Sequence, residues 1–214
     1  KHGVAFDVAV ADGGATVVEM ARRSKAMAAI NGSYFDIHKR SAITYLRQGR
    51  NLIDTTTTAE LALRVTGAVR VHGRRVHIMP WNKGIERCYR CHHGSTLASG
   101  HLLLYQGKDV LLRSSGMGFV VDKHPRSAIA LTSRGTVLLV TVDGRHPGYA
   151  GGMNLIELRH FLQQLGCTDA LNLDGGGSST LWAKGFNASG VANYPCDNHK
   201  FDHEGERKVA NALV

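Results

Sequence analysis

Apolar and polar residues alternate along much of the chain, which is the pattern of strands that bury one face. Turns containing glycine separate these runs, and this spacing predicts hairpins and a meander. The expected strands lie at 4–10, 16–20, 26–30, 44–78 (the meander), 102–105, 109–112, 128–132 and 136–142. Residues 79–99 show no period, and we interpret them as a loop or insertion.

One segment, residues 155–165, has the period of a helix. Its apolar residues recur at helical spacing, and Gly166 follows as a C-cap. Asn154 and Glu157 have the spacing of a capping box. No repeat or linker divides the chain. We therefore expect an α+β fold, a single domain over residues 1–214 in which a mixed, mostly antiparallel β-sheet packs with a few helices.

Composition is ordinary for a globular protein, with 43% hydrophobic and 20% charged residues among 214. No apolar run approaches the ~20 residues of a transmembrane span. The net charge of +9 favours an anionic partner. Because the basic residues are scattered and not interleaved with aromatics, nucleic acid is not the expected partner. The chain opens on Lys1, so we expect an exported protein whose signal segment has been removed.

Four cysteines allow several interpretations. Cys88, Cys91 and His92 spell C-x-x-C-H, the pattern of c-type haem attachment, and the cysteine pair is also half of a zinc site. No second C-x-x-C pair completes such a site. One or two disulfides among Cys88, Cys91, Cys167 and Cys196 are favoured for an exported protein, with the pairing open. Free thiols, zinc and haem remain alternatives.

The strongest candidate for chemistry lies at residues 170–182. An apolar run ends in Asp174, and Gly175, Gly176, Gly177, Ser178 and Ser179 follow it. Glycine lets the backbone approach a ligand closely, and the amides of residues 176–179 are predicted to converge as an anion-binding nest. The alternative is a glycine-rich hairpin turn with an acid at its edge.

Other strand ends also carry polar side chains. If these strands are neighbours, they bring together one group of residues, namely Asn31, Arg126, Asp143, Glu157 and Asp174. Paired carboxylates can act as general acid and base in the cleavage of a glycosidic bond, and arginine can form two parallel hydrogen bonds with a phosphate. Each residue also has a structural interpretation: Glu157 as a helix cap, Asp143 and Asn31 as turn formers, and Arg126 as a surface cation.

Several motifs occur in one order along the chain: 31–36 (NGSYFD), 124–128 (HPRSA), 142–145 (VDGR), the helix at 154–166, 171–180 (LNLDGGGSST) and 206–211 (ERKVAN). In this order they resemble the phosphodiester glycosidase family, over most of the chain from about residue 28. Residues 88–93 have no counterpart in the family pattern.

The resemblance implies a hydrolase that cleaves the glycosidic bond of a sugar-1-phosphodiester, such as N-acetylglucosamine-1-phosphodiester, and releases sugar and a phosphomonoester. Asp174, with Asp143 or Glu157, is expected to act at the sugar as base or nucleophile. Arg126 and residues 175–179 are expected to bind the phosphate. No cofactor is expected, although a divalent cation such as calcium or magnesium joining Asp143 and Asp174 stays open. The alternative function is a non-catalytic module that binds anionic glycans.

Overall fold

The computed structural model describes residues 3–91, 93–112 and 117–214, which fold around three antiparallel sheets. The first contains, in spatial order, β1 (Val8–Ala15), β14 (Val209–Leu213), β2 (Ala28–Asn31) and β13 (Leu181–Ala183). The second contains β11 (Val137–Val142), β10 (Arg126–Thr132), β12 (Cys167–Asn172), β8 (Leu102–Tyr105) and β9 (Lys108–Asp109). The third contains β4 (Asn51–Asp54), β3 (Leu46–Gln48), β7 (Ser95–Ser99), β5 (Gly67–His72) and β6 (Arg75–Pro80).

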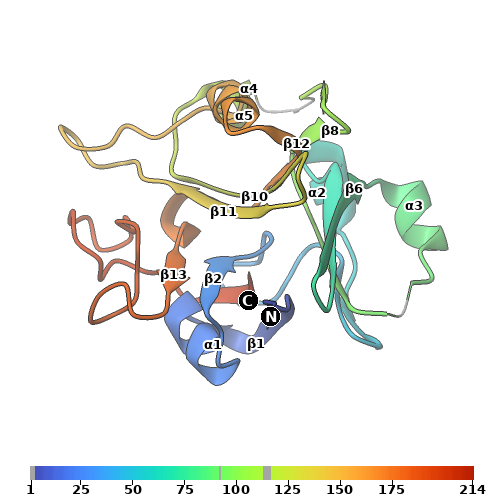
Figure 1. Cartoon of the computed structure of the whole chain (residues 1–214), viewed down its shortest axis with the longest axis horizontal. Coiled ribbons are helices and arrows are strands. Elements are labelled where there is room, and N and C mark those ends of the chain that lie inside the picture. The colour runs from blue at the N-terminus through green and yellow to red at the C-terminus, as the bar shows by residue number, and fades with distance from the viewer. Residues whose placement is uncertain (1–2, 92, 113–116) are drawn as a thin grey trace.

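Five short α-helices join or cover these sheets: α1 (Val17–Arg23), α2 (Thr58–Leu63), α3 (Lys83–Cys88), α4 (Met117–Val121) and α5 (Leu155–Gln164). In Figure 1, α4 and α5 lie together over the second sheet, and α3 projects at the outer side of the third. None of the described helices is long and apolar enough to cross a membrane. The predicted α+β class, with mostly antiparallel sheets and few helices, is confirmed.

One hydrophobic core joins all three sheets and makes them a single domain. Buried side chains from ten strands meet in it, namely Val8, Ile30, Leu46, Val69, Ile78, Leu97, Leu102, Ile129, Leu171 and Leu213. The opposite face of the second sheet packs against α5 through Leu155, Leu158 and Leu162. Fully burying a side chain of this size contributes about 1.5–3 kcal/mol, so the core fixes where the strand ends meet.

Three sequence predictions about local structure are wrong. Residues 16–20, predicted as a strand, form the start of α1, because the Thr16 hydroxyl accepts a hydrogen bond from Glu19 N (3.1 Å) and the Glu19 carboxylate accepts one from Thr16 N (2.9 Å). This capping box outweighs the strand preference of Val17 and Val18. The proposed loop at 79–99 contains α3 and the fully buried strand β7, and the predicted meander at 44–78 is interrupted by α2.

The cysteines are free thiols, so the structure does not contain the predicted disulfides. Cys167 is buried in the core beneath α5, whereas Cys88 is exposed at the end of α3. Cys91 Sγ accepts a hydrogen bond from Arg70 Nη1 at 2.9 Å. His92, which completed the haem motif, lies outside the described residues.

Candidate active site

The strand ends that carry the candidate residues lie side by side, as expected. β10 runs antiparallel to both of its neighbours, so its first residues lie beside the last residues of β11 and β12. Arg126 pairs with Val142, one residue before Asp143, and Ala128 pairs with Asn172, two residues before Asp174. The register of one central strand therefore gathers three motifs that are far apart in the sequence.

Asn31 attaches the first sheet to this group and is completely buried. Its side-chain amide donates to Asp174 O (2.6 Å), and its Oδ1 accepts from Ser127 Oγ (2.7 Å) and Thr180 N (3.1 Å). Asp174 N in turn donates to Gly32 O at 2.9 Å. The structure therefore gives Asn31 the role of holding the Asp174 loop in position.

Asp174 lies at the centre of this group and is only partly exposed. Burial raises the pKa of its carboxyl above the ordinary value of 3.8. The Ser178 hydroxyl, the Gly175 N–H and the positive charges of Arg64 and Arg207 act in the opposite direction without cancelling it. A carboxyl with a raised pKa beside fixed positive charges is typical of acid/base catalysts.

The glycine-rich loop uses most of its amides internally. It forms a 3₁₀ turn, η1 (Gly176–Ser178), in which Gly176 has a φ of +61° that favours glycine. Gly176 N donates to Pro125 O (2.9 Å), while Ser178 N and Ser179 N donate to carbonyls of the same loop (each 3.2 Å). The predicted anion nest of residues 176–179 is therefore not formed as expected, because two of its four N–H groups donate within the 3₁₀ turn and a third donates to Pro125 O.

Three consecutive hydroxyls of this loop, those of Ser178, Ser179 and Thr180, are buried and have no hydrogen-bond partner among the described residues. The Ser178 hydroxyl is near enough to Asp174 to favour its charged form, but outside the geometry of a hydrogen bond. Buried polar groups in folded proteins are nearly always paired. A run of three such groups beside a carboxylate indicates a place where polar molecules bind.

Asp143 lies beside the same loop but is held by other groups. Its Oδ1 accepts hydrogen bonds from Asn193 Nδ2 and from Tyr194 N, each at 3.0 Å. The same Asn193 nitrogen donates to Ser179 O at 3.0 Å. One amide side chain thus connects Asp143 to the backbone of the Asp174 loop, and the structure brings the two predicted carboxylates into one group.

Arg126 is placed close to the site but is fixed by the protein itself. The side chain is 2% exposed, and it donates to Met153 O (3.0 Å), Phe119 O (2.9 Å) and Asp122 O (3.0 Å). Burial lowers its pKa to about 10. The alternative interpretation of Arg126 as a surface cation is wrong, because its side chain is buried. The bonds to three carbonyls assign Arg126 to holding α4 and the residues after it against the second sheet.

Other arginines approach the site, and the sequence reasoning did not single them out. Arg64, at the end of α2, lies 3.7 Å from the ring centroid of Tyr34 and pairs with Glu60 at 2.8 Å. Arg207 forms a two-pronged ion pair with Asp197. Only the motif around residue 207 gave a signal in the sequence.

Arg145 also lies against the glycine-rich loop. A Cβ at Gly176 would come within 3.0 Å of its Nη2. It is exposed, and it forms no salt bridge with any carboxylate in the described part of the chain. Its charge is therefore available to an anionic group at the loop.

Glu157 is not joined to this group by any hydrogen bond in the described ranges. Its Oε2 accepts from Asn154 N (3.0 Å), and its Oε1 pairs with Lys123 Nζ (2.9 Å). The Lys123 ammonium and then the Asn154 N–H hold the pKa of this carboxyl below its ordinary value. The capping box predicted for α5 is confirmed, and both oxygens of Glu157 are used by these contacts.

Aromatic rings stack in the loops beside Asp143. Tyr149, Phe201, Tyr194 and His203 follow one another with centroid separations of 4.8, 4.1 and 4.3 Å. Tyr149, at the outer end of the stack, is 75% exposed. Because Tyr194 N contacts Asp143, the stack is attached directly to the candidate site. Residues 3–91, 93–112 and 117–214 hold no group of three or more His, Cys, Asp or Glu side chains suited to a metal ion.

Comparison with known proteins places this arrangement in context. Residues 24–214 match the phosphodiester glycosidase family. The uncharacterized SPbeta prophage-derived protein YomE of Bacillus subtilis is 28% identical over 177 residues, which cover 79% of this chain and 26% of YomE. The N-acetylglucosamine-1-phosphodiester alpha-N-acetylglucosaminidase of Mus musculus is 36% identical over 80 residues, 37% of this chain and 14% of that enzyme. The chain thus spans about a quarter or less of the length of these curated relatives.

Among solved structures, the zebrafish N-acetylglucosamine-1-phosphodiester alpha-N-acetylglucosaminidase catalytic domain, auto-inhibited by its pro-peptide, has a TM-score of 0.77. Sequence identity is 20%, and the match covers 98% of this chain and 72% of that chain. The two proteins therefore share a fold over nearly all of this chain.

Proposed function

Because the chain belongs to the phosphodiester glycosidase family, we propose that it hydrolyses the glycosidic bond of a sugar-1-phosphodiester. The products are the free sugar and a phosphomonoester. The observation that carries the proposal is Asp174, a carboxyl with a raised pKa. It lies where four strand ends meet, beside three buried hydroxyls that have no hydrogen-bond partner in the part of the chain that the structure describes. The net charge of +9 supports an anionic substrate.

In the proposed reaction, water attacks the anomeric carbon and Asp174 accepts its proton. The bond between the anomeric carbon and the phosphate oxygen breaks, and its electron pair leaves with the phosphomonoester. A phosphomonoester has a second pKa near 6, so this group leaves without strong protonation. The proton then passes from Asp174 to solvent or to the phosphomonoester.

In this reaction, positive charge near the glycine-rich loop stabilises the departing phosphate. Arg145 fits this role because it is exposed beside Gly176 and unpaired among the described carboxylates. Arg207 is committed to Asp197 and acts as a fixed charge. We assign Asp143 to orienting the loop and the sugar, since two N–H groups hold its Oδ1.

The aromatic stack supplies a surface for a sugar ring. The face of an aromatic ring carries partial negative charge and attracts the polarised C–H groups on the apolar side of a sugar. Tyr149 is the exposed end of the stack, so we place a sugar of the substrate against its ring.

The proposal is tested by incubating the protein with a set of sugar-1-phosphodiesters and measuring free sugar and phosphomonoester, which must appear in equal amounts. Asp174→Asn is expected to lose activity, whereas Asp12→Asn, the same change at an exposed position of β1, is expected to retain it. Calorimetric binding of these compounds without release of sugar by the wild type would overturn the proposal in favour of the non-catalytic glycan-binding module.

A further inference from the structure

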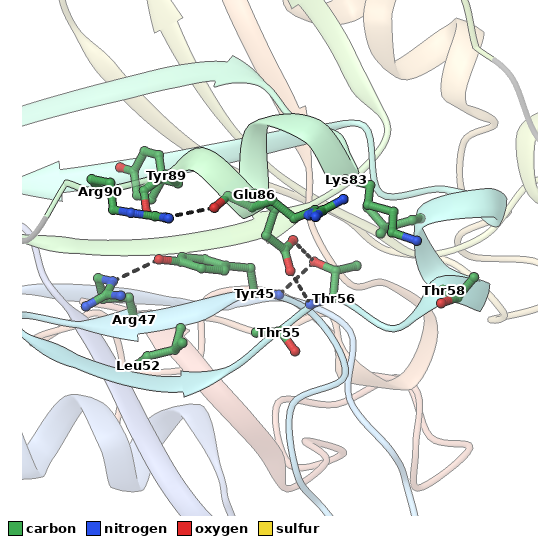
Figure 2. A pocket seen from close by; sticks show the side chains of 12 residues that line it. Tyr45, Arg47, Leu52, Thr55, Thr56, Thr58, Lys83, Glu86, Tyr89 and Arg90 are labelled. Atoms are coloured by element: carbon green, nitrogen blue, oxygen red, sulfur yellow. Dashed lines mark hydrogen bonds between the residues drawn. The ribbon is translucent and has the colours of Figure 1, made fainter.

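A pocket of about 410 Å³ lies on the third sheet, away from the candidate active site. Its wall is formed by α3 on one side and by the β3–β4 hairpin and the start of α2 on the other (Figure 2). Sites for small ligands usually have volumes of ~300–1,000 Å³, so the pocket has room for a saccharide. None of the residues assigned above to the reaction lines this pocket.

Four cations line the pocket: Arg47 from β3, Lys83 and Arg87 from α3, and Arg90 just after that helix. None of them forms a salt bridge with a carboxylate of the described residues. Lys83 and Arg87 are four residues apart, so they lie on the same face of α3. Surface cations usually have solvent around them, but four that line one pocket attract an anion together.

The one carboxylate in the pocket, Glu86, is used by the protein. It accepts hydrogen bonds from Thr56 N (2.8 Å), Thr56 Oγ1 (2.6 Å) and Trp81 Nε1 (2.7 Å). Figure 2 shows the Glu86 side chain extending from α3 to Thr56 on the facing wall. Glu86 therefore fastens α3 to the rest of the pocket, and its negative charge is directed at these donors instead of at the cations.

The pocket is also preorganised. Arg47, which is 8% exposed, donates through Nε to Tyr45 Oη (2.8 Å) and through Nη1 to Arg50 O (2.9 Å), so its guanidinium is held in one orientation. Tyr45 and Tyr89 pack edge to face at a centroid separation of 5.8 Å. Thr55 and Thr58 contribute exposed hydroxyls on the side opposite α3.

We propose that this pocket binds an anionic saccharide, with Arg47, Lys83, Arg87 and Arg90 around its phosphate or carboxylate group and the threonine hydroxyls along its polar edge. Arginine offers fixed, paired donors to either anion, and hydroxyls match the donors and acceptors of a sugar. An aromatic residue, Tyr89, lies between the cations, which is where a sugar ring would pack. The site goes beyond the proposed hydrolysis and does not depend on it.

The test is calorimetric titration of the Asp174→Asn protein, which suppresses turnover, with glucose 1-phosphate, glucuronate and glucose. One or both of the anionic sugars are expected to bind at least tenfold more tightly than glucose, and the tighter one identifies the preferred anion. The double variant Lys83→Gln/Arg87→Gln in the same background is expected to weaken that binding at least tenfold. Glutamine has a helix propensity close to that of lysine and arginine, so α3 should persist.

A matched control removes two charges elsewhere. Lys108→Gln/Arg134→Gln changes exposed residues at two hairpins of the second sheet and is expected to leave binding unchanged. Equal weakening by both double variants, or no preference for the anionic sugars, would overturn the proposal. Hydrolysis measured in Lys83→Gln/Arg87→Gln with Asp174 intact tests the proposed function separately, because that variant keeps every residue assigned to the reaction.

Discussion

Replacing Asp174 with asparagine should make the protein more stable while removing its activity. In the native structure, burial raises the pKa of this carboxyl, which means that its charged form is unfavourable there compared with the unfolded chain. Asparagine has nearly the same shape, and its Oδ1 can still accept the hydrogen bond from Gly175 N, now 2.9 Å long. Arg64 and Arg207 keep their own partners, Glu60 and Asp197. The substitution therefore removes mainly an unfavourable charge.

The size of the effect follows from the pKa difference between the folded and unfolded states. Each unit of that difference corresponds to about 1.4 kcal/mol of unfolding free energy. For a chain of 150–250 residues, 1 kcal/mol changes Tm by about 2–4 °C, so each unit is worth about 3–5 °C. The direction of the pKa shift sets the sign of the effect on stability. A carboxyl whose pKa is raised in the native state lowers the free energy of unfolding at pH values above that pKa. The cost disappears below its ordinary pKa of 3.8, where both states are protonated.

Thermal unfolding of the wild type and of Asp174→Asn from pH 3 to pH 8 measures this directly. The Tm of the variant should exceed that of the wild type at pH 7, and the difference should shrink as the pH falls. In parallel, kcat on a sugar-1-phosphodiester should fall about a hundredfold or more, as expected for loss of an acid/base group. A lower Tm for the variant at pH 7, or a difference independent of pH, would show that the charge of Asp174 is well stabilised and refute the reasoning.

Three further substitutions separate structural from catalytic roles. Glu157→Ala should lower Tm and leave kcat unchanged, because it removes a helix cap; a normal Tm with a collapsed kcat would restore the catalytic assignment. Arg126→Lys should lower Tm by several degrees, because each buried carbonyl left without a donor costs about 1–3 kcal/mol of stability. An unchanged Tm with a raised KM for phosphodiesters alone would instead indicate that Arg126 binds the phosphate. Tyr149→Ala should raise KM severalfold at constant Tm, and an unchanged KM would remove the sugar from the aromatic stack.

Local sequence patterns, such as capping boxes and the period of apolar residues, predicted part of the fold. They failed where two patterns favoured different secondary structures. The helix at α5 was predictable because the capping box of Asn154 and Glu157 precedes a clear helical period. The same kind of box at Thr16 and Glu19 precedes two valines, and their strand preference misled the interpretation. β7 was missed because a strand buried on both faces shows no alternation of apolar and polar residues. Three of its five buried residues are serine or threonine, so the segment does not have the apolar run of a buried strand either.

The candidate site divides in a similar way. Asp174, Asp143 and Asn31 were predictable as neighbours because each lies at or just after the end of a strand, and the register of β10 brings the ends of β11 and β12 together. The role of Arg126 was not predictable, since its partners are carbonyls, which every residue carries. Arg64 gave no signal either, because only the tertiary packing of α2 places its charge near Asp174.

Two asparagines explain how the site holds its carboxylates without neutralising them. Asn31 binds the backbone of Asp174, and Asn193 binds both the side chain of Asp143 and the backbone of Ser179. An amide side chain donates and accepts at once but carries no charge. At Asp174 it therefore fixes the backbone without binding the carboxylate, whose pKa is set first by burial and then by the Ser178 hydroxyl, the Gly175 N–H and more distant cations. For Asp174 those cations are Arg64 and Arg207, and each is itself held by a carboxylate of its own. The two asparagines thus fix the positions of the Asp174 loop and of Asp143, whereas Asp174 itself carries both the unfavourable buried charge and the chemistry, which is why its replacement should change stability and activity together.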